Sequence, residues 1–464
     1  MTTRTLALLL ALCAAPLPSR AADAPLQAQQ KSKEEKTAEL VAQLHNDISK
    51  TDRAIALTEL QIARSRSAPY APELQFRLAE LYVEKSRYTY LLQQAETGAS
   101  QQSSQVAPEV RLTKQKALQI YDRILRDSPD WPGCDRVRFY MAHEYRELGD
   151  FPKMIELEEE LFAKHPNSPL APEALLIVGD HWFGARELGK AEDAYNRVLA
   201  GPPSPVRDLA AFKMGWVRFN QGKHADAVKY FEQAAASPLL DGASAEVLSV
   251  KREALFDLVF SFTEARPWKG AVDYFEKLAQ SHAVYLGVLE KLANRYFIKQ
   301  EAEASVMAYR RLLMLSRDGT RDAEFAGRLH DAIKAGGDKT PPTPEDVQQI
   351  IRVAARAKSD ERMTPAERTA EVDDLEVWAR DLATTLLVIA RKAPADKPDK
   401  AALSAAADAH LAWLSLFPDH PQAAAMRKNL ADALFGAERW HEAGRAGEDV
   451  ARDAEPKPAG AEAE

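Results

Sequence analysis

The stretch GKHADAVKYFEQAAASP, residues 222–238, decides the fold class of this chain. Its residues Ala227, Phe231 and Ala234 follow one another at spacings of four and three, which places them on one face of an α-helix. Gly222 precedes this helix, and Pro238 ends it because proline cannot continue a helix. The stretch therefore predicts one amphipathic helix with a buried stripe.

The same three-position column recurs along the chain. Its first positions lie 37, 37, 36, 44 and 34 residues apart up to Ser305, and 36 residues apart in a later pair. A period of this size predicts stacked helical repeats. The column comprises Ala117, Tyr121, Ile124; Met154, Glu158, Leu161; Ala191, Tyr195, Val198; Ala227, Phe231, Ala234; Ala271, Phe275, Leu278; Ser305, Tyr309, Leu312; Ala407, Leu411, Leu414; and Ala443, Gly447, Val450.

A second column of mostly small residues lies twelve residues before the first position of each set. A small residue lets two antiparallel helices approach closely, and prolines about twelve residues after each first position stop the second helix. The small column comprises Ala142, Gly179, Gly215, Val259, Ala293 and Ala431, and the prolines are Pro129, Pro166, Pro203, Pro238 and Pro418.

These two columns resemble the tetratricopeptide repeat family, best in MGWVRFNQGKHADAVKYFEQA (214–234) and IVGDHWFGARELGKAEDAYNRVL (177–199). The resemblance is strong over 111–280, extends to 316 and over 400–452, and is weak between. It implies an all-α fold, an α-solenoid of stacked antiparallel helix pairs forming a superhelix.

An amphipathic helix is predicted ahead of the array, over residues 33–66. Val41, Ile48, Ile55 and Ile62 are spaced by seven, but threonines stand at 51 and 58, where a coiled coil wants a second apolar column. The pattern favours a helix that caps the solenoid over an oligomerising coil.

The sequence divides into six parts. We expect a signal peptide at 1–21, an amphipathic helix within 22–67 and a repeat array at 68–335 that a polar loop at 93–110 interrupts. Degenerate helical repeats and linkers follow at 336–399, with connectors at 336–344 and 393–400. Further repeats occupy 400–452, and a disordered tail follows at 453–464.

The first residues predict export. Arg4 precedes a short apolar run and a small-residue cleavage site at Ala21, the layout of a secretory signal peptide. The predicted location is the periplasm; the alternative is a membrane-anchored lipoprotein through Cys13, although Leu12 stands where lipoprotein signals have a small residue. Cleavage would change the net charge from −8 to −10, which disfavours nucleic acid as a partner. Cys134 would then be the single cysteine, with no internal disulfide, and a small, partly buried residue in a turn is favoured over a reactive thiol.

The sequence contains no recognisable catalytic motif. There is no metalloprotease signature, glycine-rich phosphate loop, nucleophile elbow or CxxC pair, and the ten histidines are scattered singly. We therefore predict no enzyme activity, no cofactor and no metal.

The resemblance assigns a partner-binding groove to the first helices of the pairs. Tetratricopeptide repeats present positions three before, one after and four after the small column toward such a groove, and here these positions are strongly aromatic. They lack the Lys, Asn and Arg set that clamps a terminal carboxylate. The aromatic residues either form the core of a tightly wound solenoid or receive an amphipathic helix or extended peptide. The predicted groove residues are Phe139, Phe183, Phe212, Trp216, Phe219, Phe256, Phe260 and Phe297.

The layout is similar to periplasmic tetratricopeptide proteins of Gram-negative envelopes, such as Tol-Pal coordinators, outer-membrane assembly factors and a myxobacterial gliding motility component. It implies a non-catalytic scaffold that binds protein partners of an envelope-spanning assembly, with gliding motility preferred. The alternative is a regulatory or substrate-binding subunit of a peptidoglycan-processing enzyme. A pocket lined by convergent carboxylates would favour this alternative.

Overall fold

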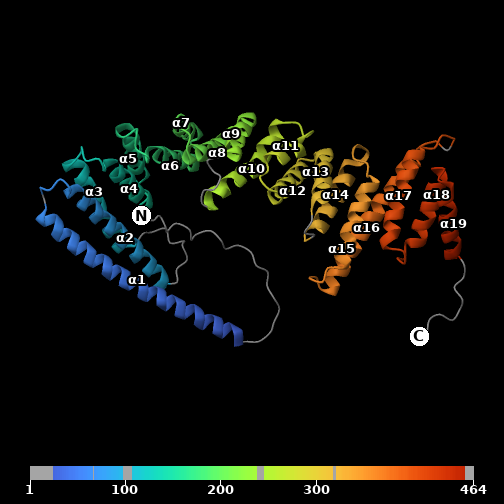
Figure 1. Cartoon of the computed structure of the whole chain (residues 1–464), viewed down its shortest axis with the longest axis horizontal. Coiled ribbons are helices and arrows are strands. Elements are labelled where there is room, and N and C mark those ends of the chain that lie inside the picture. The colour runs from blue at the N-terminus through green and yellow to red at the C-terminus, as the bar shows by residue number, and fades with distance from the viewer. Residues whose placement is uncertain are drawn as a thin grey trace. The chain divides into compact units, whose positions relative to one another are not determined.

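The computed structural model describes residues 24–65, 67–97, 107–237, 245–316, 320–394 and 396–454. Within these ranges the chain forms nineteen α-helices and one short 3-10 helix without a β-strand (Figure 1). Consecutive helices pack in adjacent pairs, so the fold is an α-solenoid and the all-α prediction is confirmed. The predicted signal peptide, with Cys13, and residues 455–464 of the tail lie outside the described residues.

The chain divides into two compact units, Met1–Val178 and Gly179–Glu464. The division falls inside one helix, α6, and coincides with none of the boundaries predicted from the sequence. The helices of the first unit are α1 (Ala24–Arg64), α2 (Ala71–Thr97), α3 (Pro108–Asp127), α4 (Cys134–Glu147), α5 (Phe151–Lys164) and the first part of α6 (Ala171–Gly184).

The second unit continues from the end of α6. Its helices are α7 (Leu188–Leu199), α8 (Pro205–Asn220), α9 (His224–Ala236), α10 (Ala245–Ala265), α11 (Ala271–Leu278), α12 (His282–Ile298), α13 (Ala302–Leu315), α14 (Asp322–Gly336), η2 (Gly337–Lys339), α15 (Pro344–Lys358), α16 (Pro365–Ala390), α17 (Lys400–Leu416), α18 (Ala423–Gly436) and α19 (Trp440–Ala454).

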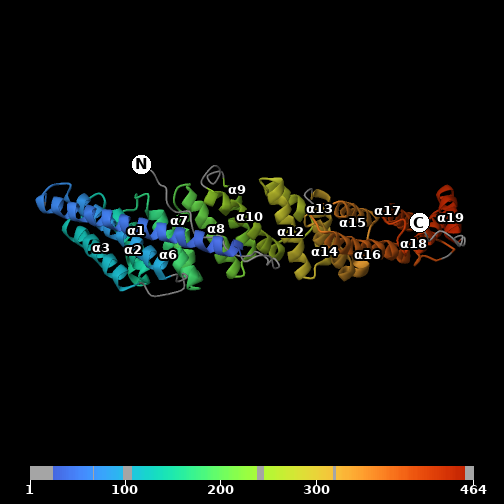
Figure 2. The ribbon, with the colours of Figure 1, turned by 90° about the horizontal axis from the view of Figure 1, so that it is seen from below.

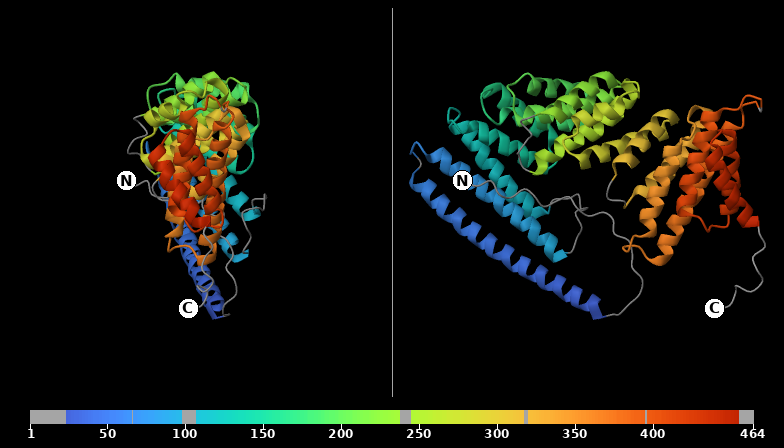
Figure 3. Two further views of the ribbon diagram at one scale, coloured as in Figure 1. Left: turned by 90° about the vertical axis from the view of Figure 1, so that its right-hand side faces the viewer. Right: turned by 45° about the vertical axis from the view of Figure 1, so that its right-hand side comes forward.

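The helix α1 lies alongside α2, as the right-hand view of Figure 3 shows. Ile55 packs with Leu78 and Leu81 of α2. The threonines of the heptad column are accommodated because Thr51 and Thr58 donate their hydroxyl protons to carbonyls one turn earlier, at 2.8 and 2.7 Å. The seven-residue column of α1 is thus used within the chain, against α2.

The repeat columns form the core of each helix pair. Ala191, Ala227 and Ala271 are fully buried, as predicted. A methyl group on Gly215 would lie 2.7 Å from the ring of Phe231, and one on Gly179 would lie 2.4 Å from the ring of Tyr195. The small residue of one helix therefore makes room for the aromatic ring of the next, which is the physical reason for the two columns.

The column predicted at Ala407, Leu411 and Leu414 is shifted by one residue from the face of α17 that is buried. The sequence placed Ala407, Leu411 and Leu414 inward, but Leu411 is 40% exposed and Trp413 is fully buried. The buried stripe of α17 includes Leu403, Ala406, Ala407, Ala409, His410 and Trp413.

The weakly repetitive region holds two regular helices, α15 and α16, which pack against each other. Each begins with a capping box followed by proline, at Thr343 and Thr364. The stretch 336–344, predicted as a connector, thus contains the start signal of a helix.

The helices of this part of the second unit form two layers. Figure 2 shows α13, α15 and α17 along one edge and α14, α16 and α18 along the other. The packing agrees, because α15 contacts both α13 and α17 while α14 contacts α16. One surface of this region is therefore formed by α13, α15 and α17, and another by α14, α16 and α18.

None of the helices in the described ranges is long and apolar enough to cross a membrane. Cys134 is buried and its Sγ lies 3.3 Å from the Ser128 carbonyl oxygen. Burial raises the pKa of its thiol, which keeps it protonated.

Candidate partner-binding surface

The predicted groove residues divide between core and surface. Phe139 and Phe212 are only 7% and 8% exposed. Both therefore lie in the core, which is the first of the two alternatives left open by the sequence, and neither is accessible to a partner. Phe139 is in the first unit, and all the other predicted residues are in the second.

Three of the half-buried residues touch one another. Trp216 and Phe219 of α8 and Phe260 of α10 form what we call the aromatic cluster. The ring centroids are 5.5 Å apart for Trp216 and Phe219, and 6.3 Å apart for each of these with Phe260. The helical spacing of α8 places Trp216 one turn above Phe212, and its ring rests on buried Phe231 at 5.7 Å.

The remaining predicted residues lie apart from this cluster. Phe256 is half-buried beneath Lys291 at 5.8 Å, and a methyl group on Gly287 would lie 2.6 Å from its ring. Phe297 is half-buried beneath Arg328 of α14 at 5.9 Å. Phe183 is half-buried near the end of α6.

Charged side chains surround the aromatic cluster. The Trp216 indole donates a hydrogen bond to Asp257 at 3.1 Å, and Lys291 pairs with the same carboxylate at 3.2 Å. Burial raises the pKa of Asp257, although Lys291 and Trp216 oppose the shift. The ammonium group of Lys291 also lies 4.3 Å from the ring centre of Phe260. The cluster therefore has aromatic rings at its centre and charged side chains around them, an arrangement that resembles the apolar core and polar rim of protein interfaces.

A second cation strengthens this arrangement. Arg295 lies 5.6 Å from the ring centre of Phe260 and pairs with Glu264 of α10 at 2.8 Å. Cation–π contacts of this kind contribute roughly 0.5–1 kcal/mol at exposed sites. The contacts of Lys291 and Arg295 hold the ring of Phe260 in place, and the exposed part of this ring can still contact a partner.

Repeat positions in the sequence could have indicated some of these charged residues, but the sequence prediction did not include them. Lys213, Asp257 and Lys291 each lie two residues before the small column of their repeats. Lys213 pairs with Asp180 at 3.3 Å, and Lys291 pairs with Asp257. Of these two pairs, Lys291 and Asp257 occupy equivalent positions of consecutive repeats, so a comparison of equivalent positions would have found that pair.

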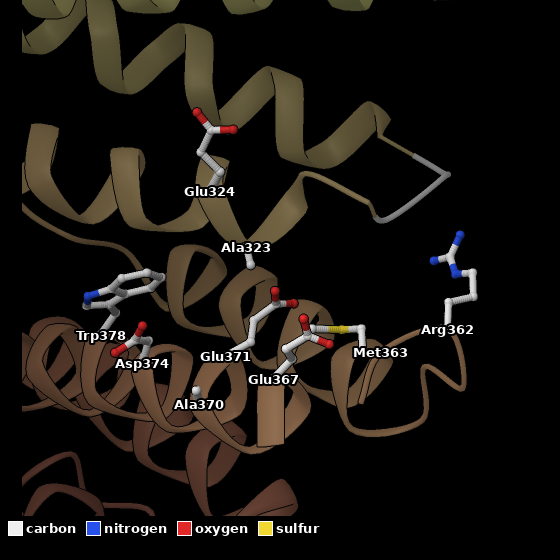
Figure 4. Close-up of a pocket in the computed structure, with 9 residues that line it drawn as sticks. All are labelled: Ala323, Glu324, Arg362, Met363, Glu367, Ala370, Glu371, Asp374 and Trp378. Carbon is white, nitrogen blue, oxygen red and sulfur yellow. The ribbon is translucent and has the colours of Figure 1, made fainter. Parts of the chain in front are cut away.

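A separate pocket of about 670 Å³ lies between α14 and α16 (Figure 4). Its lining includes Glu324, Glu367, Glu371, Asp374, Met363 and Trp378. The indole of Trp378 stacks on His330 at 6.2 Å.

The pKa values of two carboxyl groups in this pocket are shifted in opposite directions. Glu367 accepts hydrogen bonds from the backbone and hydroxyl of Thr364, which lower its pKa. Burial, with the nearby charge of Asp360, raises the pKa of Glu371. Glu324 lies across the pocket on α14 and pairs with Arg321 at 2.9 Å. The pocket can attract a cationic or hydrogen-bonding group.

No group of His, Cys, Asp or Glu side chains in the described ranges is arranged to hold a metal ion.

Comparisons with known proteins agree with the helix pairs. Residues 141–205 and 209–237 each match a tetratricopeptide repeat family. Over these residues the chain is similar to tetratricopeptide repeats. The matched residues run from α4 to α9 and include Trp216 and Phe219. A search of curated protein sequences found no match.

The search of solved structures found similarities at low sequence identity. The apo quorum sensor NprR from B. thuringiensis is 13% identical, with 74% of this chain and 94% of that chain covered at a TM-score of 0.29. A signal-transduction ATPase with a tetratricopeptide repeat sensor from Pyrococcus horikoshii is 13% identical, with 84% and 54% covered at 0.29. The Cut9–Hcn1 heterotetramer of APC/C is 14% identical, with 84% and 74% covered at 0.24.

Tetratricopeptide repeats suggest a scaffold for protein–protein interaction. The aromatic cluster provides ring faces next to ion-paired charges.

Proposed function

We propose that this chain is a non-catalytic scaffold of the periplasm that holds protein partners of an envelope-spanning assembly, with the gliding motility machinery as the preferred instance. The aromatic cluster is the observation that carries the binding role. Trp, Tyr and Arg are enriched where interfaces gain most of their free energy, and the cluster offers the half-buried indole of Trp216 and the ring of Phe260 with two cations beside that ring.

The location rests on the amino-terminal sequence. Arg4, the apolar run and the small residues before Ala22 have the layout of a secretory signal peptide. Mass spectrometry of the mature amino terminus is the test. A chain beginning near Ala22 supports the proposal, and a lipid-modified Cys13 would replace it with a membrane-anchored lipoprotein.

A site-specific photo-cross-linker tests the binding role. Asn220 is exposed on α8 and donates to the Trp216 carbonyl at 2.8 Å, so a cross-linker at residue 220 samples the aromatic cluster. The matched control is residue 229, where the Lys229 side chain is 71% exposed on α9. Cross-linking in living cells should join residue 220, but not residue 229, to an envelope protein.

Two results would contradict this role. One is the absence of any adduct at residue 220 in cells that express the full chain. The other is the same set of adducts from both positions, since random contact with abundant envelope proteins would not distinguish α8 from α9.

The pocket between α14 and α16 favours a second candidate, a substrate-binding or regulatory subunit of a peptidoglycan-processing enzyme. Its lining gathers four carboxyl groups, those of Glu324, Glu367, Glu371 and Asp374, beside the indole of Trp378. Binding of muropeptides that is lost in Glu371→Gln and retained in Glu73→Gln, an exposed glutamate of α2, would favour this candidate.

A further inference from the structure

Two hollows flank α15 on the layer formed by α13, α15 and α17. One of about 500 Å³ lies between α15 and α17, and one of about 320 Å³ lies between α13 and α15. Arg352 lines both. The aromatic cluster lies on α8 and α10, so these hollows belong to a different part of the second unit.

Both hollows have apolar walls. Ile351 is buried at the hollow beside α17, and Leu411 is 40% exposed there. Leu313 is buried at the hollow beside α13, and Met314 is 52% exposed there. Each hollow thus presents one large apolar side chain to solvent above a buried one.

A positive charge, that of Arg352, lies between the two hollows. Arg352 is exposed and has no carboxylate partner among the residues that the structure describes. Asp408, which lines the hollow beside α17, pairs with Arg439 at 2.6 Å. Arg356, which lines the other hollow, pairs with buried Asp322 at 2.5 Å. Among the described residues, the guanidinium group of Arg352 therefore stands unpaired between two apolar hollows.

We propose that this face, which we call the Arg352 face, docks an extended segment of a protein partner in which an acidic residue lies between two apolar residues. The carboxylate would pair with Arg352, because a guanidinium group matches a carboxylate in shape and charge. The two apolar side chains would enter the hollows on either side of α15.

The spacing of the hollows sets the spacing of the partner's residues. Packed helices lie about 8–10 Å apart, so hollows on opposite sides of one helix are separated by about the same distance. In the polyproline II conformation a chain rises about 3.1 Å per residue with three residues per turn, so residues three positions apart lie on one side of the chain and about 9 Å apart. The partner segment should therefore carry apolar residues three positions apart with Asp or Glu between them.

This inference goes beyond the binding role proposed for the aromatic cluster. With two docking surfaces built from different helices, the chain could hold two partners at once. Either surface could fail its test without affecting the other.

The test is selection of random peptides displayed on phage, with the full chain as bait. Recovered peptides should be enriched in an acidic residue between apolar residues three positions apart. A synthetic peptide of the recovered sequence should bind Arg352→Glu and Arg352→Gln at least about tenfold more weakly than the unmodified chain.

Two controls separate this face from others. Arg445 of α19 is also exposed and makes no direct ion pair or hydrogen bond among the described residues, so Arg445→Glu makes the same charge change elsewhere and should leave affinity unchanged. Trp216→Ala with Phe260→Ala should also leave it unchanged, whatever happens to the partner of the aromatic cluster. Circular dichroism should show Arg352→Gln folded, since its side chain is exposed and unpaired.

Three results would overturn the proposal. The first is the recovery of peptides without acidic enrichment, and the second is equal affinity for the unmodified chain and Arg352→Gln. The third is a concentration-dependent dimer in light scattering that Arg352→Glu abolishes, which would assign the face to a second copy of this chain.

Discussion

Adding a methyl group to Gly215 tests the close approach of α8 and α9. In Gly215→Ala the new carbon would lie 2.7, 2.8 and 3.0 Å from three ring atoms of Phe231, well inside van der Waals contact. The ring cannot withdraw easily, because Phe231 is fully buried and packs against Phe212 at 5.9 Å and Trp216 at 5.7 Å.

The expected change in the free energy of unfolding of Gly215→Ala is the sum of two opposing contributions. Overpacking of a core costs about 1–3 kcal/mol. Replacement of glycine by alanine inside a helix gains about 0.5–1 kcal/mol from backbone entropy and helix propensity. We expect Gly215→Ala to be destabilising by roughly 0.5–2 kcal/mol, a net loss from a substitution that ordinarily stabilises helices.

Gly444→Ala is the matched control. Gly444 is exposed inside α19, and a methyl group there would meet no atom within 4 Å. The same substitution should therefore raise stability by up to about 1 kcal/mol. Urea unfolding followed by circular dichroism compares the two midpoints. A midpoint for Gly215→Ala at or above that of the unmodified chain would refute the helix pairing derived from the two columns.

Two further predictions concern the first unit and α15. Glu158 occupies the column position that carries an aromatic ring in most repeats, and burial raises its pKa from 4.5 to about 8. The folded unit keeps a proton that the unfolded chain releases, so its stability should fall as pH rises from 4.5 to about 8, by at most roughly 5 kcal/mol. Glu158→Gln should flatten this dependence in urea midpoints measured over that range, and an unchanged slope would contradict the assignment. Thr343→Ala removes the capping box of α15 and should cost about 1 kcal/mol in the same assay, whereas no change would mean that packing alone sets the start of this helix.

Sequence periodicity was sufficient to predict the buried faces of the central helix pairs, because small and aromatic residues recur there at fixed repeat positions. Gly179 and Gly215 are required by the rings above them, and such residues mark a register clearly. In α17 the stretch AALSAAADAHLAWLSL has apolar residues on several faces, so spacing alone did not fix which face is buried. The indole of Trp413 donates to buried Glu376 at 3.1 Å, a contact between residues of separate helices that no local pattern reveals.

The candidate surface was predictable in part for the same reason. The aromatic positions follow from the repeat, but their exposure depends on neighbouring helices. Phe212 is buried, and Phe260 lies beneath Lys291 and Arg295 of α12. Residues more than thirty positions apart decide which rings remain accessible, and the sequence pattern of one helix carries no information about them.

The most direct test of the central claim is a pair of readings on one double variant, Trp216→Ala with Phe260→Ala. Its matched control is Phe435→Ala with Trp440→Ala, which removes another Phe–Trp contact, at 5.0 Å, from side chains that are 65% and 54% exposed. Thermal melting and capture of the partner cross-linked at residue 220 are measured for both. A partner-binding surface predicts that only the first variant loses capture while both still melt cooperatively. Retained capture, or a first variant that no longer folds, would contradict the account and mean that the aromatic cluster only holds the solenoid together.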